Sequence, residues 1–217
     1  MLKEKKIKIC FIGNPNVGKS TLINRLLNSN ELQISKNPGT TKTIIEKNLI
    51  RNEKEFILLD TAGVYKKKNF NFNLLIKATR FSETIILILD STIDKLDKIH
   101  KKLASHTLKV GKGLIIIINK WDLIKNKKNK KKEIEEFFKN SLPQFKKENL
   151  LFISALRDEN FTKIFKYSVE IKKLLKSSMS TSNLNKWLRE ITKYNPPIKI
   201  RGKEIKFKYI VQTDTNP

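Results

Sequence analysis

The sequence predicts an α/β fold in which helices cover a largely parallel sheet. Apolar runs of strand length recur at regular intervals, and stretches with helical spacing lie between most of them. The runs are rich in isoleucine and nearly continuous, which is typical of strands buried on both faces of a sheet. We expect strands at Ile7–Ile12, Ile44–Ile50, Phe56–Leu59, Ile85–Leu89, Leu114–Ile118 and Leu150–Ile153.

The connections between these runs set the expected topology. A short turn, Arg51–Glu55, separates the second run from the third, so these two strands are expected to form an antiparallel hairpin. Helical spacing in the longer connections predicts parallel strand pairs elsewhere. The expected helices are Thr21–Leu27, Leu96–Val110, Lys131–Asn140 and Thr162–Leu175.

The C-terminal part of the sequence has a different composition. Ser177–Ser182 is small and polar and is expected to be a linker. A helix is expected at Leu184–Tyr194, ended by Pro196 and Pro197. Apolar residues at 205, 207, 209 and 211 then alternate with other residues and predict a half-exposed strand. The expected division is an α/β domain over 1–176, a linker over 177–182 and a partial α+β segment over 183–217.

The charge balance favours an anionic partner. The chain has 46 Lys and Arg against 21 Asp and Glu, a net charge of +25, and such a surplus attracts polyanions by neutralising phosphates. Only six of the basic residues are Arg, which suggests codon drift in an AT-rich genome. The positive charge is therefore interpreted equally as RNA contact and as compositional bias, and the two explanations are compatible. No DNA partner is expected.

The first apolar run and the cysteine count bear on location. Ile7–Ile12 is too short for a signal sequence or a membrane span, so no membrane partner is expected. The single cysteine, Cys10, excludes a disulfide framework and is interpreted as a small core residue in a strand. These features fit a soluble protein in a reducing cytoplasm, and a monomer is expected.

A glycine-rich segment after the first strand matches the phosphate-binding pattern G-x-x-x-x-G-K-[ST]. Its glycines let the backbone wrap a phosphate chain, and the following helix N-terminus supplies positive potential. Lys19 should reach the β- and γ-phosphates, and Ser20 should offer its hydroxyl to Mg²⁺. The alternative, an ordinary glycine turn, is much less favoured. The expected phosphate contacts are Gly13, Asn14, Pro15, Asn16, Val17, Gly18, Lys19, Ser20 and Thr21.

Asp60, Thr61, Ala62 and Gly63 follow the third expected strand. An aspartate at a strand end facing the phosphate loop can hold Mg²⁺, usually through a water. The Gly63 amide can approach the γ-phosphate because no Cβ is in the way. Alone this tetrapeptide indicates a turn, but after a phosphate loop it predicts a second part of the same site.

Asn119, Lys120, Trp121 and Asp122 follow the fifth expected strand. A carboxylate held edge-on to guanine accepts hydrogen bonds from the ring N1–H and the exocyclic amine, whereas adenine offers neither donor there. Asn119 would brace the loop and the Lys120 stem could lie along the base plane, while Trp121 is favoured as packing over ligand contact. After the sixth expected strand, Ser154, Ala155 and Leu156 would present a backbone amide to the guanine oxygen.

Pro38–Thr41 lies in the polar loop between the first helix and the second strand. One of its hydroxyls could complete the Mg²⁺ shell when the γ-phosphate is present, and Thr41 is preferred over Thr40. The metal ligands expected from the sequence are therefore Ser20, Thr41 and Asp60, and the expected catalytic groups are Lys19, Thr41 and Gly63. The expected ligands are GTP or GDP with Mg²⁺.

These elements, in this order, indicate a three-layer P-loop NTPase (Ras-like) domain and resemble bacterial GTPases of the Era and Der/EngA group, most closely the second GTPase domain of Der. The resemblance rests on Asn14–Asn24, Pro38–Thr41, Asp60–Gly63 and Lys112–Leu114 leading to Asn119–Asp122. A second set resembles the start of that family's KH-like, RNA-associated domain: Leu184–Leu188, Pro196, Pro197, Arg201–Lys203 and Ile205–Tyr209.

The resemblance implies a GTP-hydrolysing switch that acts in assembly of the large ribosomal subunit, with that subunit or its rRNA as partner. It also places Asn16 where K⁺-dependent relatives hold the cation, although an asparagine adopting a turn conformation is an equal interpretation. Val64 occupies the position where Ras-type enzymes carry a water-orienting glutamine, so slow intrinsic hydrolysis is expected. The family normally has two GTPase domains and a complete KH-like domain, so the chain is either a fragment or a reduced homologue.

Two other functions compete with the switch. In the first, the protein is an RNA-binding assembly factor whose nucleotide pocket is mainly structural. In the second it is an ATPase, which Asp122 argues against. The basic run Lys66–Lys68 is interpreted equally as RNA contact or as a solvated loop, and Lys125–Lys132 is favoured as a solvated loop. His100 and His106 have no ligand partners at metal-binding spacing.

Overall fold

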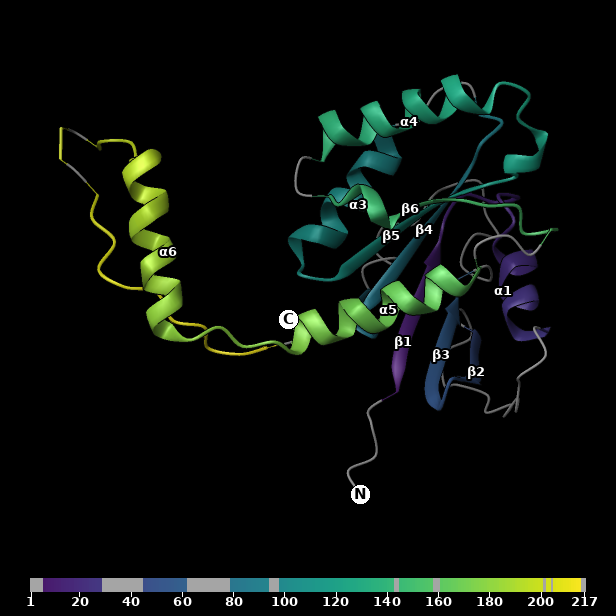
Figure 1. The fold of residues 1–217 in the computed structure, drawn as a ribbon, viewed down its shortest axis with the longest axis horizontal. Helices are drawn as coiled ribbons and strands as arrows, with labels where there is room; N and C mark the ends of the chain where they lie inside the picture. Colours follow the sequence, from purple (N-terminus) through teal and green to yellow (C-terminus); the bar gives the residue numbers. More distant parts are fainter. Residues whose placement is uncertain are drawn as a thin grey trace. The chain divides into compact units, whose positions relative to one another are not determined.

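Figure 1 shows the fold in the computed structural model, which describes residues 6–28, 45–61, 79–93, 98–142, 145–157, 161–200, 202–203 and 205–215. The chain divides into two compact units, Met1–Lys173 and Leu174–Pro217, which we call unit 1 and unit 2.

Unit 1 is built on a six-stranded sheet with the order β2-β3-β1-β4-β5-β6. The pairs β1–β3, β1–β4, β4–β5 and β5–β6 are parallel, and only the hairpin β2–β3 is antiparallel, which confirms the expected largely parallel sheet. The strands are β1 (Ile7–Ile12), β2 (Ile45–Arg51), β3 (Lys54–Asp60), β4 (Thr84–Asp90), β5 (Gly113–Asn119) and β6 (Leu150–Phe152).

Helices cover both faces of this sheet, which gives three layers (Figure 1). Cys10 of β1 lies in one buried cluster with Leu103 of α3 and Phe138 of α4. On the opposite face, Phe56 of β3 packs edge-on against Phe165 of α5, with ring centroids 4.9 Å apart. The helices of unit 1 that the structure describes are α1 (Lys19–Asn28), α3 (Lys98–Lys109), α4 (Lys127–Ser141) and α5 (Phe161–Lys176), of which α5 crosses the boundary with unit 2.

Helix α4 corrects one expectation. It begins at Lys127, four residues before the expected start, because the Asn126 side chain accepts a hydrogen bond from the Asn129 N–H and caps the helix. Most of Lys125–Lys132, expected to be a loop, is therefore the first part of α4. Its lysines remain on the surface and form helical ion pairs, such as Lys131 Nζ to Glu135 Oε1 at 4.0 Å.

Unit 2 contains α6 (Thr181–Tyr194), capped at its start by the Ser180 hydroxyl, which accepts from the Asn183 N–H. The helix begins earlier than expected, which shortens the expected linker to 177–180. None of the α6 residues is buried.

The prediction of a strand around residues 205–211 is wrong. Within the described part of unit 2, the pairing between strand-like segments is the single bridge Ile200–Lys203, and 205–214 adopt no regular structure. The alternating pattern finds no neighbouring strand there to bond with. Instead, the Asn185 side chain accepts a hydrogen bond from the Ile210 N–H at 3.0 Å and donates one to the Ile210 carbonyl at 2.9 Å.

No helix among the described residues has the length and apolar character needed to cross a membrane. Cys10 lies in β1 with no exposed surface, as expected for a core residue, and burial raises the pKa of its thiol to about 12.

Candidate functional site

The phosphate loop lies where the sheet changes direction. β1 is central, and the chain continues to β3 on one side and to β4 on the other. In open α/β sheets, ligands bind beyond the carboxyl ends of the strands at this switch point. The loop that follows β1 and leads into α1 therefore occupies the position expected of a binding site.

Two glycines of the loop stand where a side chain would not fit. A Cβ on Gly13 would overlap the Ile88 carbonyl oxygen, and a Cβ on Gly18 would overlap the Asn119 amide nitrogen. Gly18 also has a φ of +94°, in the range that residues with a Cβ disfavour, and Asn16, two residues earlier, has a φ of 63°. The Gly18 carbonyl accepts from the Leu22 N–H at 2.9 Å, so the loop passes directly into α1.

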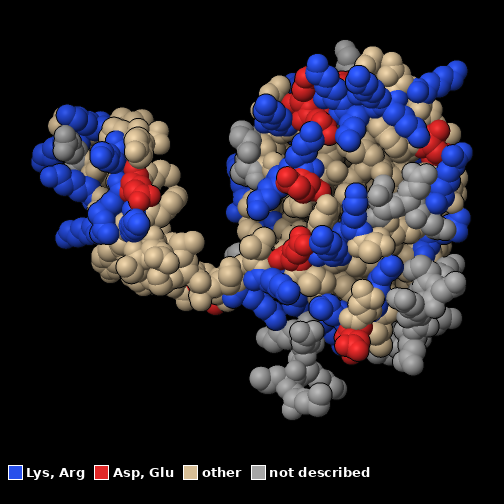
Figure 2. All heavy atoms as spheres, in the orientation of Figure 1, with Lys and Arg blue, Asp and Glu red and all other residues tan. Residues whose placement is uncertain are grey.

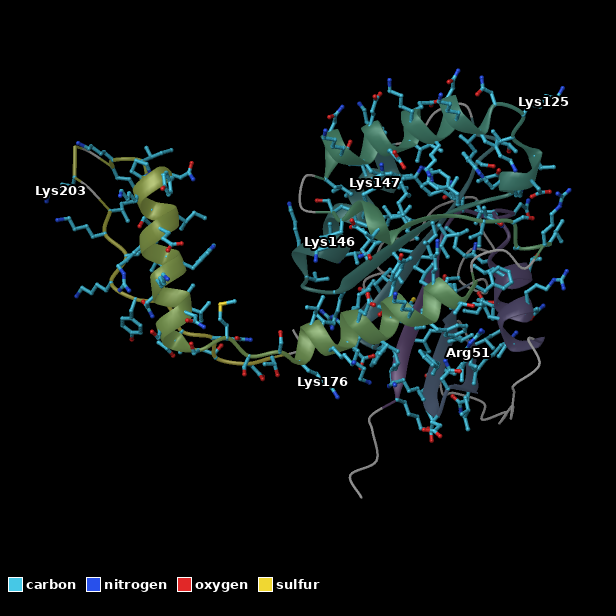
Figure 3. The ribbon with its side chains drawn as sticks, viewed as in Figure 1. Arg51, Lys125, Lys146, Lys147, Lys176 and Lys203 are labelled. Atoms are coloured by element: carbon cyan, nitrogen blue, oxygen red, sulfur yellow. The ribbon has the colours of Figure 1, made fainter. Side chains whose placement is uncertain are left out.

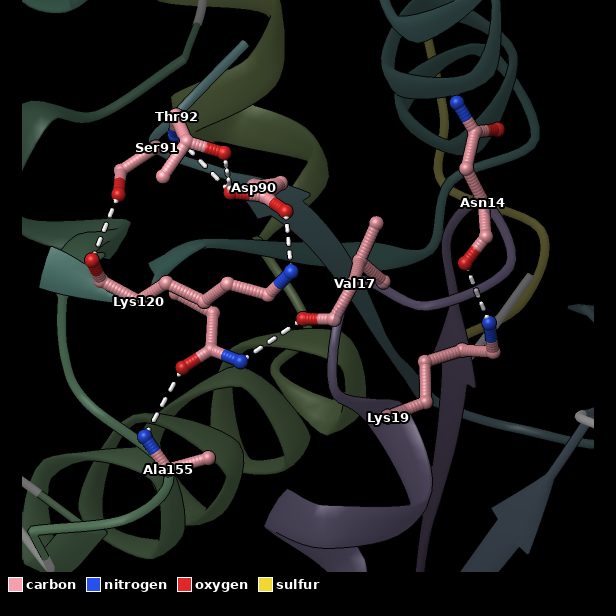
Figure 4. A network of polar contacts seen from close by, with 9 residues as sticks. Asn14, Val17, Lys19, Asp90, Ser91, Thr92, Lys120 and Ala155 are labelled. Atoms are coloured by element: carbon pink, nitrogen blue, oxygen red, sulfur yellow. Dashed lines mark hydrogen bonds and ion pairs between the residues drawn. The ribbon is translucent and has the colours of Figure 1, made fainter. Parts of the chain in front are cut away.

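Lys19 is buried against this loop. Its Nζ donates to the carbonyls of Gly13, at 2.9 Å, and of Asn14, at 2.7 Å, the second of which is drawn in Figure 4. Burial lowers the pKa of Lys19 to about 8, although the nearby Asp60 carboxylate opposes the shift. The ammonium is therefore held at the loop in a place where a negative ligand would lower the cost of its burial.

Two of the three groups expected to hold Mg²⁺, Ser20 and Asp60, lie at the start of α1 and at the end of β3. Ser20 is exposed in the first turn of α1, whereas Asp60 is 3% exposed at the end of β3. The next residue, Thr61, donates its hydroxyl to the Phe11 carbonyl at 2.7 Å and ties β3 to β1. One hydroxyl and one carboxylate oxygen fit a hard cation that takes its other ligands from phosphate and water.

Several expected residues lie outside the described ranges. They are Pro38, Thr40, Thr41, Ala62, Gly63, Val64 and Lys66–Lys68. Among the described residues there is no group of three or more His, Cys, Asp or Glu that could hold a metal ion.

Asn119 joins three of the expected motifs. Its Nδ2 donates to the Val17 carbonyl of the phosphate loop at 2.8 Å, and its Oδ1 accepts from the Ala155 N–H at 2.9 Å (Figure 4). The side chain is 2% exposed, so neither bond is exchanged easily for water. The phosphate loop, the loop after β5 and the loop after β6 are thus one hydrogen-bonded unit.

The loop after β5 separates the roles of its residues. Trp121 is buried and packs on Phe152 with ring centroids 4.5 Å apart. Asp122 is partly exposed on the short 3₁₀ turn Trp121–Leu123. The nearby Ser154 side chain lowers the pKa of Asp122, and the charges of Arg157 and Lys127 act in the same direction. Asp122 therefore stays an ionised acceptor at neutral pH.

The loop after β6 is anchored on both sides. Ser154 and Ala155 are buried, while the side chain of Leu156 is exposed. The Leu156 carbonyl accepts from the Arg25 guanidinium of α1 at 2.5 Å.

Two groups at the site were not expected from the sequence. Asp90, the last residue of β4, forms an ion pair with Lys120 at 2.5 Å, and His100 of α3 lies 3.3 Å from the Asn14 amide through its Nε2. The signal for Asp90 is its register: in the parallel pair β4–β5 it lies opposite Asn119. A sequence without strand pairing does not reveal that register.

Comparison with protein families gives two matches. Residues 8–120 match the family described as 50S ribosome-binding GTPase. Residues 178–217 match the KH-domain-like C-terminal domain of EngA bacterial GTPase enzymes.

Similar curated proteins are GTPases Der. The chain is 33% identical over 226 residues to GTPase Der of Rickettsia akari, covering 100% of this chain and 50% of that protein. It is 35% identical over 216 residues to GTPase Der of Pelodictyon phaeoclathratiforme, covering 97% and 49%. The chain therefore spans about half the length of the curated relatives it matches.

Solved structures of Era share the fold. Era of Aquifex aeolicus bound to GDP and AlF₄⁻ aligns with a TM-score of 0.60 and 28% identity, over 77% of this chain and 57% of that one. Era in complex with MgGDPNP and a segment of 16S ribosomal RNA aligns with the same TM-score and 29% identity, over the same shares of the two chains. Taken with the family match over residues 8–120, these comparisons show that the chain belongs to the 50S ribosome-binding GTPase family.

Proposed function

We propose that the protein binds GTP and GDP with Mg²⁺, hydrolyses GTP, and acts as a switch in ribosome assembly. The observation that carries this proposal is the pair of buried hydrogen bonds of the Asn119 side chain. It donates to the Val17 carbonyl at 2.8 Å and accepts from the Ala155 N–H at 2.9 Å. They fix the phosphate loop relative to the loop that carries Asp122. A ligand with both a phosphate chain and a base fits such an arrangement.

The base specificity of the proposal rests on Asp122. An ionised carboxylate can accept two hydrogen bonds from guanine, and adenine would leave it facing a ring lone pair. The lowered pKa of Asp122 supports this role because the group has no proton to donate to adenine at neutral pH. In the proposal, Ser154, Ala155 and Leu156 present a backbone amide to the base.

The phosphate contacts of the proposal are the loop residues 13–21, with Lys19 as the cation that offsets developing charge. Ser20, Thr41 and Asp60 would hold Mg²⁺, which when bound supplies further positive charge at the phosphates. Gly63 and Thr41 complete the proposed catalytic set, with Thr61 and Ala62 beside them. Because Val64 has no hydrogen-bonding group to orient the attacking water, intrinsic hydrolysis of GTP should be slow. K⁺, held by Asn16, is a further proposed cofactor.

The proposed partner is the large ribosomal subunit or its rRNA. The net charge of +25 supports an anionic partner. In Figure 2, Lys and Arg side chains gather at the top of the view, where Figure 1 places α4, and Lys125, beside α4, reaches outward in Figure 3. The proposal further takes the protein as a cytoplasmic monomer, with a GTPase domain over 1–176 and a KH-like segment after it.

Calorimetry tests the nucleotide part of the proposal. Titration of the protein with GTP, GDP or ATP in the presence of Mg²⁺ should give heat for the guanine nucleotides alone. Asp122→Asn should move the preference from guanine toward xanthine nucleotides, because the amide donates where the carboxylate accepted. Asp214→Asn, on the exposed surface of unit 2, is the matched control and should leave the affinity for GDP unchanged. Equal heats with ATP and GTP would remove the proposal.

Sedimentation with large ribosomal subunits tests the switch. The protein should co-migrate more with a GTP analogue than with GDP or with no nucleotide. Lys19→Ala should abolish that difference, since it removes the ammonium at the phosphate loop. Association that stays the same in every nucleotide state and in Lys19→Ala would favour the alternative, an RNA-binding assembly factor with a mainly structural pocket.

A further inference from the structure

Asp90, the last residue of β4, and the next residue, Ser91, hold the side chain and the main chain of Lys120 (Figure 4). Lys120 Nζ lies 2.5 Å from Asp90 Oδ2. The Ser91 hydroxyl donates to the Lys120 carbonyl at 2.9 Å, and the Ser91 N–H donates to the Asn119 carbonyl at 2.9 Å. The main chain and the side chain of Lys120 are therefore both fixed from the neighbouring strand.

Asp90 is itself held in place for this contact. Its Oδ1 accepts from the Thr92 N–H at 2.9 Å and from the Thr92 hydroxyl at 2.7 Å, which leaves Oδ2 for the ammonium. Burial alone would raise the pKa of Asp90, but the Lys120 ammonium and the Thr92 donors outweigh it and hold the pKa below its ordinary value. The carboxylate is 12% exposed and stays charged.

The backbone of Lys120 explains why it needs fixing. Its φ of 61° and ψ of 31° lie in the left-handed region, which a residue with a Cβ disfavours. The residue stands between Asn119, which bonds the phosphate loop, and the turn that carries Asp122. Any shift at Lys120 would therefore move Asp122 relative to the phosphate loop.

We propose that Asp90 is a positioning residue for the nucleotide base, because it takes up the Lys120 ammonium and leaves the methylene stem of Lys120 for the base. The same pairing keeps this ammonium from competing for Asp122, which lies two residues further along the chain. This inference rests on the proposed guanine-nucleotide function and adds to it a residue that acts through another side chain.

A double-mutant cycle tests the inference by calorimetric affinity for GDP with Mg²⁺. Asp90→Asn keeps the size of the side chain and an oxygen for Thr92 but removes the charge, and should weaken binding about threefold to tenfold. Lys120→Met keeps an apolar stem and leaves Asp90 without its cation. If Asp90 acts through Lys120, the double variant should bind no more weakly than Lys120→Met alone.

Glu55→Gln is the matched control, since it removes a carboxylate from an ion pair, Lys6 to Glu55 at 3.0 Å, away from the site. It should leave the affinity unchanged. Thr92→Val, which removes one donor to Asp90, should give a smaller loss than Asp90→Asn and no loss in the Lys120→Met background. Thermal unfolding of each variant shows that it is folded.

Two results would overturn the inference. One is an unchanged affinity in Asp90→Asn, and the other is a double variant whose loss equals the sum of the two single losses. Absence of GDP binding by the unaltered protein would instead remove the proposed function, so the two failures are distinguishable.

Discussion

Each unit of this protein uses an asparagine amide to join two segments of chain, but the two amides work in different surroundings. Asn119 in unit 1 is 2% exposed and bonds Val17 and Ala155. Asn185 in unit 2 is only partly buried and bonds both backbone groups of Ile210. Water can replace the bonds of Asn185 far more readily than those of Asn119.

The difference shows what burial adds to a hydrogen bond. A typical intramolecular bond contributes about 1 kcal/mol net, whereas a buried group left without a partner costs about 1–3 kcal/mol. Unit 1 surrounds its amide with a sheet and helices, while in unit 2 none of the residues of α6 is buried. Site geometry in unit 1 is therefore fixed by desolvation as much as by the bonds themselves.

The largest effect should come from Asn119→Ala. It leaves the Val17 carbonyl and the Ala155 N–H without their partner, so the free energy of unfolding should fall by about 2–4 kcal/mol. Urea unfolding followed by circular dichroism measures this change, and calorimetry should show no heat with GDP. A loss below that of Asn185→Ala would contradict the comparison between the two units.

Lys19→Met should have a smaller effect of the opposite sign on the protein without nucleotide. The pKa of Lys19 is about 8 when folded and about 10.4 when unfolded, so folding disfavours the charged form. Below pH 8 the full cost is present, and Met should raise the free energy of unfolding by up to about 3 kcal/mol. Between pH 8 and 10.4 the folded protein loses the proton of Lys19 while the unfolded chain keeps it. The stability of the unaltered protein therefore rises with pH, and the cost disappears.

The pH series needs a difference measurement, because the difference removes every contribution that the two proteins share. The free energy of unfolding of Lys19→Met minus that of the unaltered protein should decrease across this window and approach zero above it. A difference that grows with pH would show that the ammonium stabilises the folded state.

Asn185→Ala should act on unit 2 alone. Loss of a partly exposed amide should destabilise the contact with Ile210 by about 0.5–1.5 kcal/mol. The Ile210 N–H donates to the side-chain oxygen of Asn185, so its hydrogen exchange should become faster when that side chain is removed. The affinity of unit 1 for GDP should not change, and a weaker affinity would mean that the amide also supports the nucleotide site.

The smallest effect should come from Glu136→Gln on α4. Its ion pair with Lys132 spans 3.9 Å, and the two side chains are 60% and 78% exposed. Exposed helical pairs contribute about 0.3–0.5 kcal/mol at most. The change in thermal midpoint should therefore be close to the error of the measurement, at low and at high salt alike.

The sequence indicated the strands of unit 1 well because burial on both faces leaves a plain signal. Ile85–Leu89 has no polar residue and became the buried centre of β4. The hairpin β2–β3 and the order of the site loops also followed from spacing alone. Asn119 was expected to brace the loop that contains it, although its partners were not known.

Other features depend on contacts that one sequence does not reveal. The start of α4 was missed because Lys127–Lys132 has no apolar spacing, and the Asn126 cap decides the boundary. The alternation at 205–211 predicted a strand because it carries no information about whether a partner strand lies beside it. Asp90 was missed because its contact with Lys120 comes from the pairing of β4 with β5.

The bonds of Asn119 have a consequence for how the protein is made. Val17 leaves the ribosome before Asn119, which lies 102 residues further along the chain, and Ala155 follows 36 residues after Asn119. A nascent chain that ends before Ala155 lacks the last partner of the amide, however well its first strands have formed. The three loops therefore become one hydrogen-bonded unit only after Ala155 has been added, and shorter nascent chains leave one oxygen of the Asn119 side chain without its native donor.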